Sequence, residues 1–284
     1  MNKTKLSIVI PASAISDTPH PREKTAKIGL IGRAAAIFRV DEIIVYPDNP
    51  KLDQRRDIDY IALLLNYIET PQYLRKTLFK LDPDLEFAGI LPPLRTPHHP
   101  LSGKTKHLQA GEYREGVVLS EVKDGLVVDI GVQQPALLRQ KQFAVGDRLT
   151  LQVVNVGRQI DVQAANREDV PQYWGYRVRV EERSFGHLLK DGRFDLAIAT
   201  ARVGDNFMDV AAKIGGKWRG SQRVLVAFGA PSRGLHEIVE DEGLKLGGMV
   251  DFVVNTVPNQ GTVTVRMEEA LLASLAVLNV HFNW

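Results

Sequence analysis

Apolar positions along the first ninety residues follow an alternating order of strand and helix. Apolar runs at 5–11 and 41–46 predict two strands, each bounded by proline. The segments 24–39, 57–69 and 72–80 have apolar residues at helical spacing, so they predict helices. Strands that alternate with helices are typical of α/β proteins with a mostly parallel sheet.

The pattern changes after the proline-rich stretch 91–100. Short β segments between glycines are predicted at 115–121, 126–130, 134–138, 148–155 and 159–163, with Asp124-Gly125 as a hairpin turn. Five such strands predict a small barrel of the OB or S1-like kind. Barrels of this size bind single-stranded nucleic acid through aromatic side chains, here only Tyr113 and Phe143, so RNA contact and a purely structural role both remain open.

The α/β pattern returns after Pro171. Strands are predicted at 173–180 and 194–200, and helices at 184–190 and 205–213, the latter ended by Gly215 and Gly216. We therefore expect an α/β domain in two parts, 1–92 and 168–284, interrupted by a barrel domain at 93–167. The closing aromatic residues, Phe282 and Trp284, are expected to pack on a neighbouring surface or on a second subunit.

Two strand–glycine turn–helix units end the chain. An apolar strand at 224–228 leads to Gly229 and Gly234, and a second strand at 249–254 leads through Pro258 and Gly261 to an apolar helix. Loops of this kind present backbone N–H groups to a ligand at the carboxyl end of a strand. The pattern indicates a pocket for a nucleotide-like small molecule, with two ordinary turns as the alternative.

Composition sets broad limits. The length of 284 residues suits two domains, and the net charge of +2 neither requires nor excludes a nucleic-acid partner. The absence of cysteine excludes disulfides, a thiolate nucleophile and cysteine-bound zinc. The apolar run at 6–10 is too short for a signal sequence or a membrane span, so we expect a cytoplasmic protein with no membrane partner.

Motifs for covalent or metal-dependent chemistry are missing. The sequence has no Gly-x-Gly-x-x-Gly fingerprint and no phosphate loop. Ser232 lies near His236, but Ala230 replaces the glycine that a nucleophile elbow requires. The histidines form no helical i, i+4 pair, so no metal is expected. Methyl transfer from S-adenosylmethionine needs neither kind of site, because the sulfonium is already activated and the protein has only to bind and orient the reactants.

Three motifs carry a family resemblance. FGAPSRGL at 228–235 and NTVPNQGTVTVR at 255–266 resemble the two cofactor loops of SPOUT methyltransferases. KIGLIGRAAAIFRVDEI at 27–43 resembles the first motif of that superfamily, a helix with glycine, arginine and phenylalanine. The chain is most similar to the archaeal and eukaryotic RNA methyltransferase group with a barrel inserted in the α/β domain.

This resemblance implies a fold and a site. It implies an α/β, SPOUT-type, mostly parallel sheet with a C-terminal trefoil knot, a homodimer, and a pocket for S-adenosylmethionine (SAM). Arg33 would reach the acceptor nucleotide across the dimer interface. The RNA phosphates would meet Arg22, Arg202, Arg233 and Arg266. The cofactor would be bound by Thr200, Ala201, Phe228, Gly229, Ala230, Pro231, Gly234, Asn255, Thr256, Val257, Pro258, Asn259, Gly261 and Thr262.

The activity implied by the resemblance is SAM-dependent methylation of RNA, with ribosomal RNA as the expected substrate. Uridine N3 and the ribose 2′-oxygen are both open as acceptors, since N3 must lose a proton and no base is evident from the sequence. A non-catalytic RNA- or ribosome-binding protein and a protein methyltransferase are the rival hypotheses. Met267 stands where the family has threonine, and we expect a neutral packing change there.

Overall fold

The computed structural model describes residues 4–284, which form two compact units. The sheet unit comprises the described residues up to Asn66, together with Glu86–Pro92 and Tyr176–Trp284. The barrel unit comprises Tyr67–Leu85 and Pro93–Gly175. Residues 67–85, whose helical pattern continues the first α/β stretch in sequence, therefore lie with the barrel.

Six parallel strands form the sheet of the sheet unit, in the order β11-β9-β10-β1-β2-β8. The strands are β1 (Lys5–Pro11), β2 (Glu42–Tyr46), β8 (Arg177–Val180), β9 (Leu196–Asn206), β10 (Arg223–Ala227) and β11 (Phe252–Asn255). The central β1 is buried on both faces, which explains its continuous apolar run. Because the strands are parallel, their carboxyl ends meet at one edge of the sheet.

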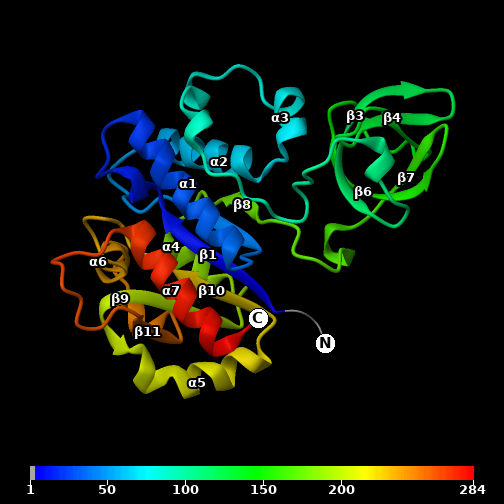
Figure 1. The fold of residues 1–284 in the computed structure, drawn as a ribbon. Coiled ribbons are helices and arrows are strands. Elements are labelled where there is room, and N and C mark those ends of the chain that lie inside the picture. The colour runs from blue at the N-terminus through cyan, green and yellow to red at the C-terminus, as the bar shows by residue number, and fades with distance from the viewer. Residues whose placement is uncertain (1–3) are drawn as a thin grey trace. The chain divides into compact units, whose positions relative to one another are not determined.

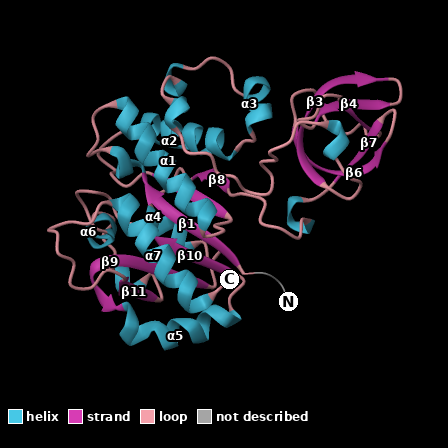
Figure 2. Ribbon diagram, viewed as in Figure 1, coloured by secondary structure: helices cyan, strands magenta, loops and turns pink. Residues whose placement is uncertain are grey.

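Helices cover both faces of this sheet (Figures 1 and 2). Helices α4 (Phe185–Lys190) and α6 (Leu235–Glu240) share one core with Val9, Ile44 and Leu225 of the strands. Helices α1 (Pro21–Ile37), α5 (Phe207–Gly220) and α7 (Met267–Phe282) form the other layer, in which α7 contacts both α1 and α5. Helix α2 (Arg55–Glu69) lies beside α1, where Tyr60 Oη and Thr25 Oγ1 are 2.9 Å apart.

The barrel unit contains a closed five-stranded barrel in the order β3-β4-β5-β7-β6. Its strands are β3 (Tyr113–Val122), β4 (Gly125–Asp129), β5 (Ala136–Leu138), β6 (Arg148–Val156) and β7 (Ile160–Ala164). Only the β5–β7 pair is parallel, so the barrel has the strand pairing of an OB-like fold. Leu126, Val128 and Leu151 are among the residues that fill it.

Helix α3 (Gln72–Leu78) packs on the barrel through Tyr73. The Tyr73 hydroxyl donates to the carbonyl oxygen of Glu115 at 2.7 Å. Gly131 has φ of 77°, and a Cβ there would lie 2.6 Å from the Tyr73 ring. Glycine is therefore required at this turn, both by its backbone conformation and by the ring that covers it.

A group of charged side chains connects Glu69, the last residue of α2 and part of the barrel unit, to the barrel strands, and its two glutamates are buried. Arg148 donates to Glu69 Oε2 at 2.7 Å and to Glu115 Oε2 at 2.6 Å. Arg167 donates to Glu69 Oε1 at 3.1 Å, and the indole of Trp174 donates to Glu115 Oε1 at 2.6 Å. We call Glu69, Glu115, Arg148 and Arg167 the barrel ion network.

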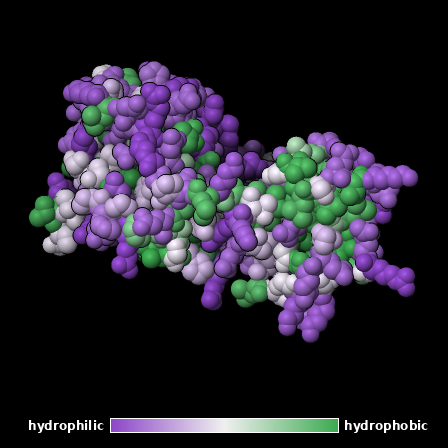
Figure 3. Space-filling model, turned by 90° about the horizontal axis from the view of Figure 1, so that it is seen from above, coloured by the Kyte–Doolittle hydropathy of each residue, from purple (hydrophilic) through white to green (hydrophobic). Residues whose placement is uncertain are grey.

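On the face shown in Figure 3, hydrophobic residues are interspersed with polar ones over the barrel. The exposed apolar side chains of the barrel strands include Leu119, Val122 and Val154. They are separated by charged positions such as Glu121 and Lys123, so the barrel surface is mixed rather than uniformly basic.

Several element boundaries differ from the sequence-based expectations. Helix α5 continues past the Gly215-Gly216 pair to Gly220, because Gly215 lies against the Phe282 ring of α7, where a side chain would crowd. Strand β9 runs to Asn206, beyond the expected end at 200, while β8 begins only at Arg177. The closing aromatics pack within the unit, with Phe282 stacked on Trp218 at 4.8 Å and the Trp284 indole donating to the Phe38 carbonyl.

Candidate functional site

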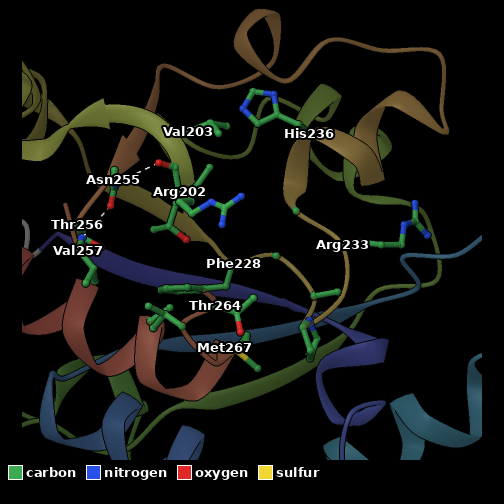
Figure 4. A pocket seen from close by; sticks show the side chains of 18 of the residues that line it. Arg202, Val203, Phe228, Arg233, His236, Asn255, Thr256, Val257, Thr264 and Met267 are labelled. Carbon is green, nitrogen blue, oxygen red and sulfur yellow. Dashed lines mark hydrogen bonds between the residues drawn. The ribbon is translucent and has the colours of Figure 1, made fainter. Parts of the chain in front are cut away.

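A pocket of about 370 Å³ lies at the carboxyl ends of β9, β10 and β11 (Figure 4). Three segments of the sheet unit and the first turns of α7 line it. These segments are residues 200–203 within β9, the loop 228–234 after β10, and the loop after β11. The volume falls at the lower end of the range for small-molecule sites in proteins.

The first wall is an excursion within β9. Residues Ile198 and Ala199 pair with β11, and pairing resumes only at Asp205 and Asn206, so residues 200–204 leave the ladder. A Cβ on Gly204 would lie 2.7 Å from the backbone nitrogen of Val254, so glycine is needed where the excursion returns. This β-bulge turns Thr200, Ala201 and Arg202 into the pocket lining.

The second wall is the loop between β10 and α6. The backbone N–H of Ala230 donates to the Arg233 carbonyl at 2.8 Å, which closes a tight turn. A Cβ on Gly229 would lie 3.2 Å from that same carbonyl oxygen and from the backbone nitrogen of Leu235. Glu237 Oε2 accepts from the N–H of Gly234 at 3.1 Å, so this carboxylate caps α6.

The third wall is the loop 255–266, which is tied to the first. Asn255 Oδ1 accepts from the N–H of Val257 at 2.9 Å, while its Nδ2 donates to the Arg202 carbonyl at 2.9 Å. The Arg202 guanidinium in turn donates to the Val263 carbonyl at 3.0 Å. Asn259 takes a left-handed φ of 57°, which asparagine tolerates better than most residues. These bonds hold the two loops at a fixed separation.

Polar groups deep in the pocket bond to one another. The Thr200 hydroxyl donates to the Ala227 carbonyl at 2.9 Å, and the hydroxyls of Thr256 and Ser274 lie 2.7 Å apart. Phe228, Val257 and Met267 add apolar surface. The pocket thus offers a largely apolar wall with backbone groups and a few hydroxyls, which suits a ligand with a flat apolar part and scattered polar atoms.

The start of α7 is fixed by carboxylates beside the pocket. Glu269 Oε2 accepts from the N–H of Arg266 at 2.9 Å, which caps the helix. Glu268 lies 3.2 Å from the buried ammonium of Lys27, which also donates to Asp17 at 2.6 Å. Burial opposes ionisation of Asp17, but the hydrogen bond and charge of Lys27 lower its pKa below the usual value. Both glutamates therefore position α7.

Comparison with known proteins decides the family. A family model described as "Putative RNA methyltransferase" matches residues 5–278, nearly the whole chain. The chain belongs to this RNA methyltransferase family.

Individual relatives agree with this assignment. An uncharacterised protein of Halobacterium salinarum is 33% identical over 96% of this chain and 98% of its own length. Two proteins named 28S rRNA (uridine-N(3))-methyltransferase, from Mus musculus and Homo sapiens, are each 32% identical over 96% of this chain. The match covers 75% of the mouse protein and 77% of the human protein.

The structure brings together most of the residues expected to bind the cofactor of this methyltransferase. Those that line the pocket are Thr200, Ala201, Phe228, Gly229, Ala230, Pro231, Gly234, Asn255, Thr256 and Val257. Pro258, Asn259, Gly261 and Thr262 belong to the same loop but are not among the lining residues. Of the arginines, Arg202 and Arg233 line the pocket, whereas Arg22 and Arg33 lie on α1 and Arg266 precedes α7.

Sequence reasoning missed several residues of the pocket. These are Val203, Glu237, Val254, Gln260, Val263, Thr264, Val265, Ala270 and Ser274, together with His236, which the sequence indicates only as a neighbour of Ser232. Ser274 had a signal, since it is a hydroxyl within an otherwise apolar helix and is fully buried. Met267 is 3% exposed and also lines the pocket, so the departure from threonine falls at the site itself.

Within residues 4–284, no helix is long and apolar enough to cross a membrane. The same part of the chain holds no group of three or more histidine, aspartate or glutamate side chains that could bind a metal ion.

Proposed function

We propose that this RNA methyltransferase transfers the methyl group of SAM to N3 of a uridine in ribosomal RNA. The observation that carries the proposal is the pocket at the carboxyl edge of the sheet, walled by the two loops that resemble SPOUT cofactor loops. Uridine N3 is favoured over the ribose oxygen by the names of the mouse and human relatives, which are both uridine-N(3) methyltransferases.

The residues present fit a SAM molecule. Its adenine and ribose would lie against Phe228, Val257 and Met267, and its polar atoms would meet backbone groups of the three walls. Gly229 fits this role because a side chain there would fill space at the turn and meet backbone atoms 3.2 Å away. SAM supplies an activated methyl group, and the chain supplies binding, orientation and the removal of the N3 proton. A C-terminal trefoil knot would be the backbone path of these loops.

We also propose that the enzyme is a homodimer through α1 and α7. These helices contact each other, and Leu30, Ile37, Leu272 and Val280 on them are between 47% and 81% exposed. Arg33 lies three residues after Leu30 and four before Ile37, on the same face of α1. If a second copy of the chain packs on this face about a two-fold axis, Arg33 of one copy would lie near the pocket of the other copy. There the arginine would contact the acceptor nucleotide.

Arg22, Arg202, Arg233 and Arg266 are the proposed contacts to RNA phosphates. Arg202 and Arg233 line the pocket, so they would hold phosphates nearest to the reacting base. The cytoplasmic location expected from the sequence stays a prediction.

Calorimetric titration with SAM tests the cofactor site. The wild-type protein is expected to bind with micromolar affinity, and the Gly229→Trp variant to bind at least a hundredfold more weakly because the indole fills the pocket. Gly216→Trp is the matched control, since Gly216 lies outside the pocket lining and a Cβ there meets nothing within 4 Å. Equal affinity of all three proteins would refute the site.

Incubation with ribosomal RNA and labelled SAM tests the reaction. Digestion to nucleosides should release labelled N3-methyluridine, identified by mass spectrometry. If the label appears only in 2′-O-methyl nucleosides, the acceptor is the ribose oxygen and not uridine N3. Label that survives ribonuclease but not protease would indicate a protein substrate.

Mixing inactive variants tests the dimer. Neither Arg33→Ala nor Gly229→Trp should be active alone, yet their mixture should recover activity, because one site of a mixed dimer has both an intact pocket and an intact arginine. Leu272→Glu should sediment as a monomer. A Leu272→Glu protein that sediments like the wild type would exclude this interface.

A further inference from the structure

The outer part of the pocket carries a histidine nitrogen without a partner. His236 is the second residue of α6, and its side chain lines the pocket. Its Nε2 atom is buried and has no hydrogen-bond partner among the described residues. A buried polar atom left unpaired costs free energy, so in a native fold it calls for an explanation such as a bound ligand or a catalytic role.

The other ionisable side chains of the pocket are already engaged. Arg202 donates to the Val263 carbonyl, and Glu237 accepts from the N–H of Gly234. Arg233 donates to Asp241 and to the Glu237 carbonyl. Among the ionisable residues that line the pocket, His236 is therefore the one whose buried ring nitrogen has no partner within residues 4–284.

Two valines of the pocket lining are exposed although they are apolar. Val203 is 74% exposed and Val263 is 84% exposed, and both line the pocket from different walls. The bond from Arg202, the neighbour of Val203, to the Val263 carbonyl fixes the distance between these walls. Figure 4 draws Val203 and His236 at the upper rim of the pocket and Met267 and Thr264 at the opposite end.

We propose that this outer part is the subsite for the acceptor base, in which Val203 and Val263 pack against the uracil ring and His236 Nε2 accepts the N3 proton. The inference rests on the proposed uridine N3 reaction and adds the proton acceptor that the reaction requires. Apolar side chains at the rim gain from covering a flat ring, and a neutral imidazole is a suitable base near neutral pH.

The chemical step balances with these groups. The N3–H bond breaks as its proton moves to His236 Nε2, and the electron pair left on N3 forms a bond to the methyl carbon. The carbon–sulfur bond breaks with its electrons remaining on sulfur, which gives N3-methyluridine and S-adenosylhomocysteine. The imidazolium then passes its proton to water. Positioned bases of this kind accelerate proton transfer by roughly 10²- to 10⁴-fold.

Charged groups lie near His236. Arg202, Arg233 and Glu237 share the pocket with it. The elements that pack against α6 add Asp205 of β9 and Lys190 of α4, and Glu240 lies on α6 itself. His187 is the matched control, because it is an exposed histidine of the same unit outside the pocket lining.

Single-turnover methylation of ribosomal RNA by the full-length protein tests the inference. His236→Ala should lower the rate by about 10²- to 10⁴-fold at pH 7, while His187→Gln should keep the wild-type rate. The loss should shrink at least tenfold when 5-fluorouridine, whose N3 is more acidic, replaces uridine in the substrate. Added imidazole should restore part of the rate. Calorimetric affinity for SAM should stay within twofold of wild type, which reports on folding of the site.

Binding of the RNA to the protein loaded with S-adenosylhomocysteine tests the valines. A Val203→Ser, Val263→Ser double variant should bind several-fold more weakly, whereas His236→Ala should bind as tightly as wild type.

Three results would overturn the inference in separable ways. A His236→Ala protein with the wild-type rate would show that His236 is not the proton acceptor, and the proposed function would be unaffected. A loss that is equal for uridine and 5-fluorouridine and does not respond to imidazole would assign His236 a structural role. A wild-type protein that binds SAM but forms no N3-methyluridine would refute the proposed function and this inference with it.

Discussion

The barrel unit and the pocket of the sheet unit differ in how far their buried polar groups are paired. In the barrel ion network, Glu69 and Glu115 are nearly inaccessible, and each accepts from cationic side chains within 3.1 Å. In the pocket, side-chain polar groups bond to their own walls, and His236 Nε2 is left without a partner. The first arrangement fixes a structure, whereas the second leaves capacity for a ligand.

The pKa values of the network show how strongly its members depend on one another. Burial alone would raise the pKa of Glu69, but Arg148, His98 and Arg167 together hold it far below its usual value. A carboxylate that stays ionised inside a protein needs all of its partners, and the partners equally need the carboxylate. Loss of one member should therefore cost more than loss of any single bond in the pocket.

Removal of Glu69 is the largest expected effect. Glu69→Ala should destabilise the barrel unit by about 3–5 kcal/mol, because the largely enclosed Arg167 would lose this carboxylate and Arg148 would keep only Glu115. Hydrogen exchange of the β3 and β6 amides would measure the loss. Glu121→Ala is the control, since Glu121 forms only an exposed 3.5 Å pair with Lys141, and its exchange should match wild type. Equal effects of the two variants would show that the buried network contributes no more to stability than an exposed ion pair.

Acidification should weaken the same unit. Burial and the neighbouring His98 lower the pKa of His99 to about 4, so this ring is neutral in the fold where an unfolded chain would already bind a proton. As pH falls from about 6.5 to 4, the unfolded state gains a proton first, and stability should drop by up to about 3 kcal/mol. Below pH 4 both states bind it and the loss levels off.

Comparison of exchange rates at pH 7 and pH 5 checks this expectation. His99→Gln should flatten the profile over that range, whereas His107→Gln, at an exposed site, should leave it unchanged. The Glu69 contribution is lost in the same direction but at lower pH, because its lowered pKa keeps the folded carboxylate ionised where the unfolded one is already protonated. A flat wild-type profile between pH 6.5 and 4 would contradict the role of His99.

An added methyl group should disturb the pocket at its bulge. Gly204→Ala should cost about 1–3 kcal/mol and weaken SAM binding about tenfold, because the Cβ would lie 2.7 Å from the Val254 backbone and shift the first wall. Gly216→Ala on α5 meets nothing within 4 Å and should be neutral or slightly stabilising. Calorimetry and thermal unfolding measure both effects, and unchanged SAM affinity of Gly204→Ala would show that the bulge does not shape the site.

The smallest expected effect is at Ser274. Ser274→Ala should cost about 1 kcal/mol, because it removes one hydrogen bond to Thr256 without exposing a charge. Ser120→Ala, at an exposed position, should not change the unfolding temperature. A loss at Ser274 as large as that at Glu69 would mean that the pocket is as rigidly specified as the barrel network.

Much of the architecture followed from local pattern. The strands β1, β2 and β10, the helices α1, α2 and α7, and the five barrel segments were predicted with small boundary errors, because burial on one or both faces imposes a period that the sequence displays. Gly229 and Gly234, which the sequence pattern predicted to lie in a ligand-binding loop, both line the pocket.

Other features depended on residues far apart in the sequence, and no local pattern could display them. Helix α5 passes through Gly215 because Phe282 lies against it, and the bulge in β9 exists because Val254 lies against Gly204. Arg148 of the barrel network has its partner at Glu69, and the unpaired nitrogen of His236 emerges only when its surroundings are known. The sequence by itself determined the elements, the barrel and the glycine-bearing loops that line the pocket, since these rest on short-range periodicity and backbone conformation. Tertiary structure alone decided which polar groups form hydrogen bonds with one another and which remain available to a ligand, because hydrogen-bond satisfaction is a property of the packed fold.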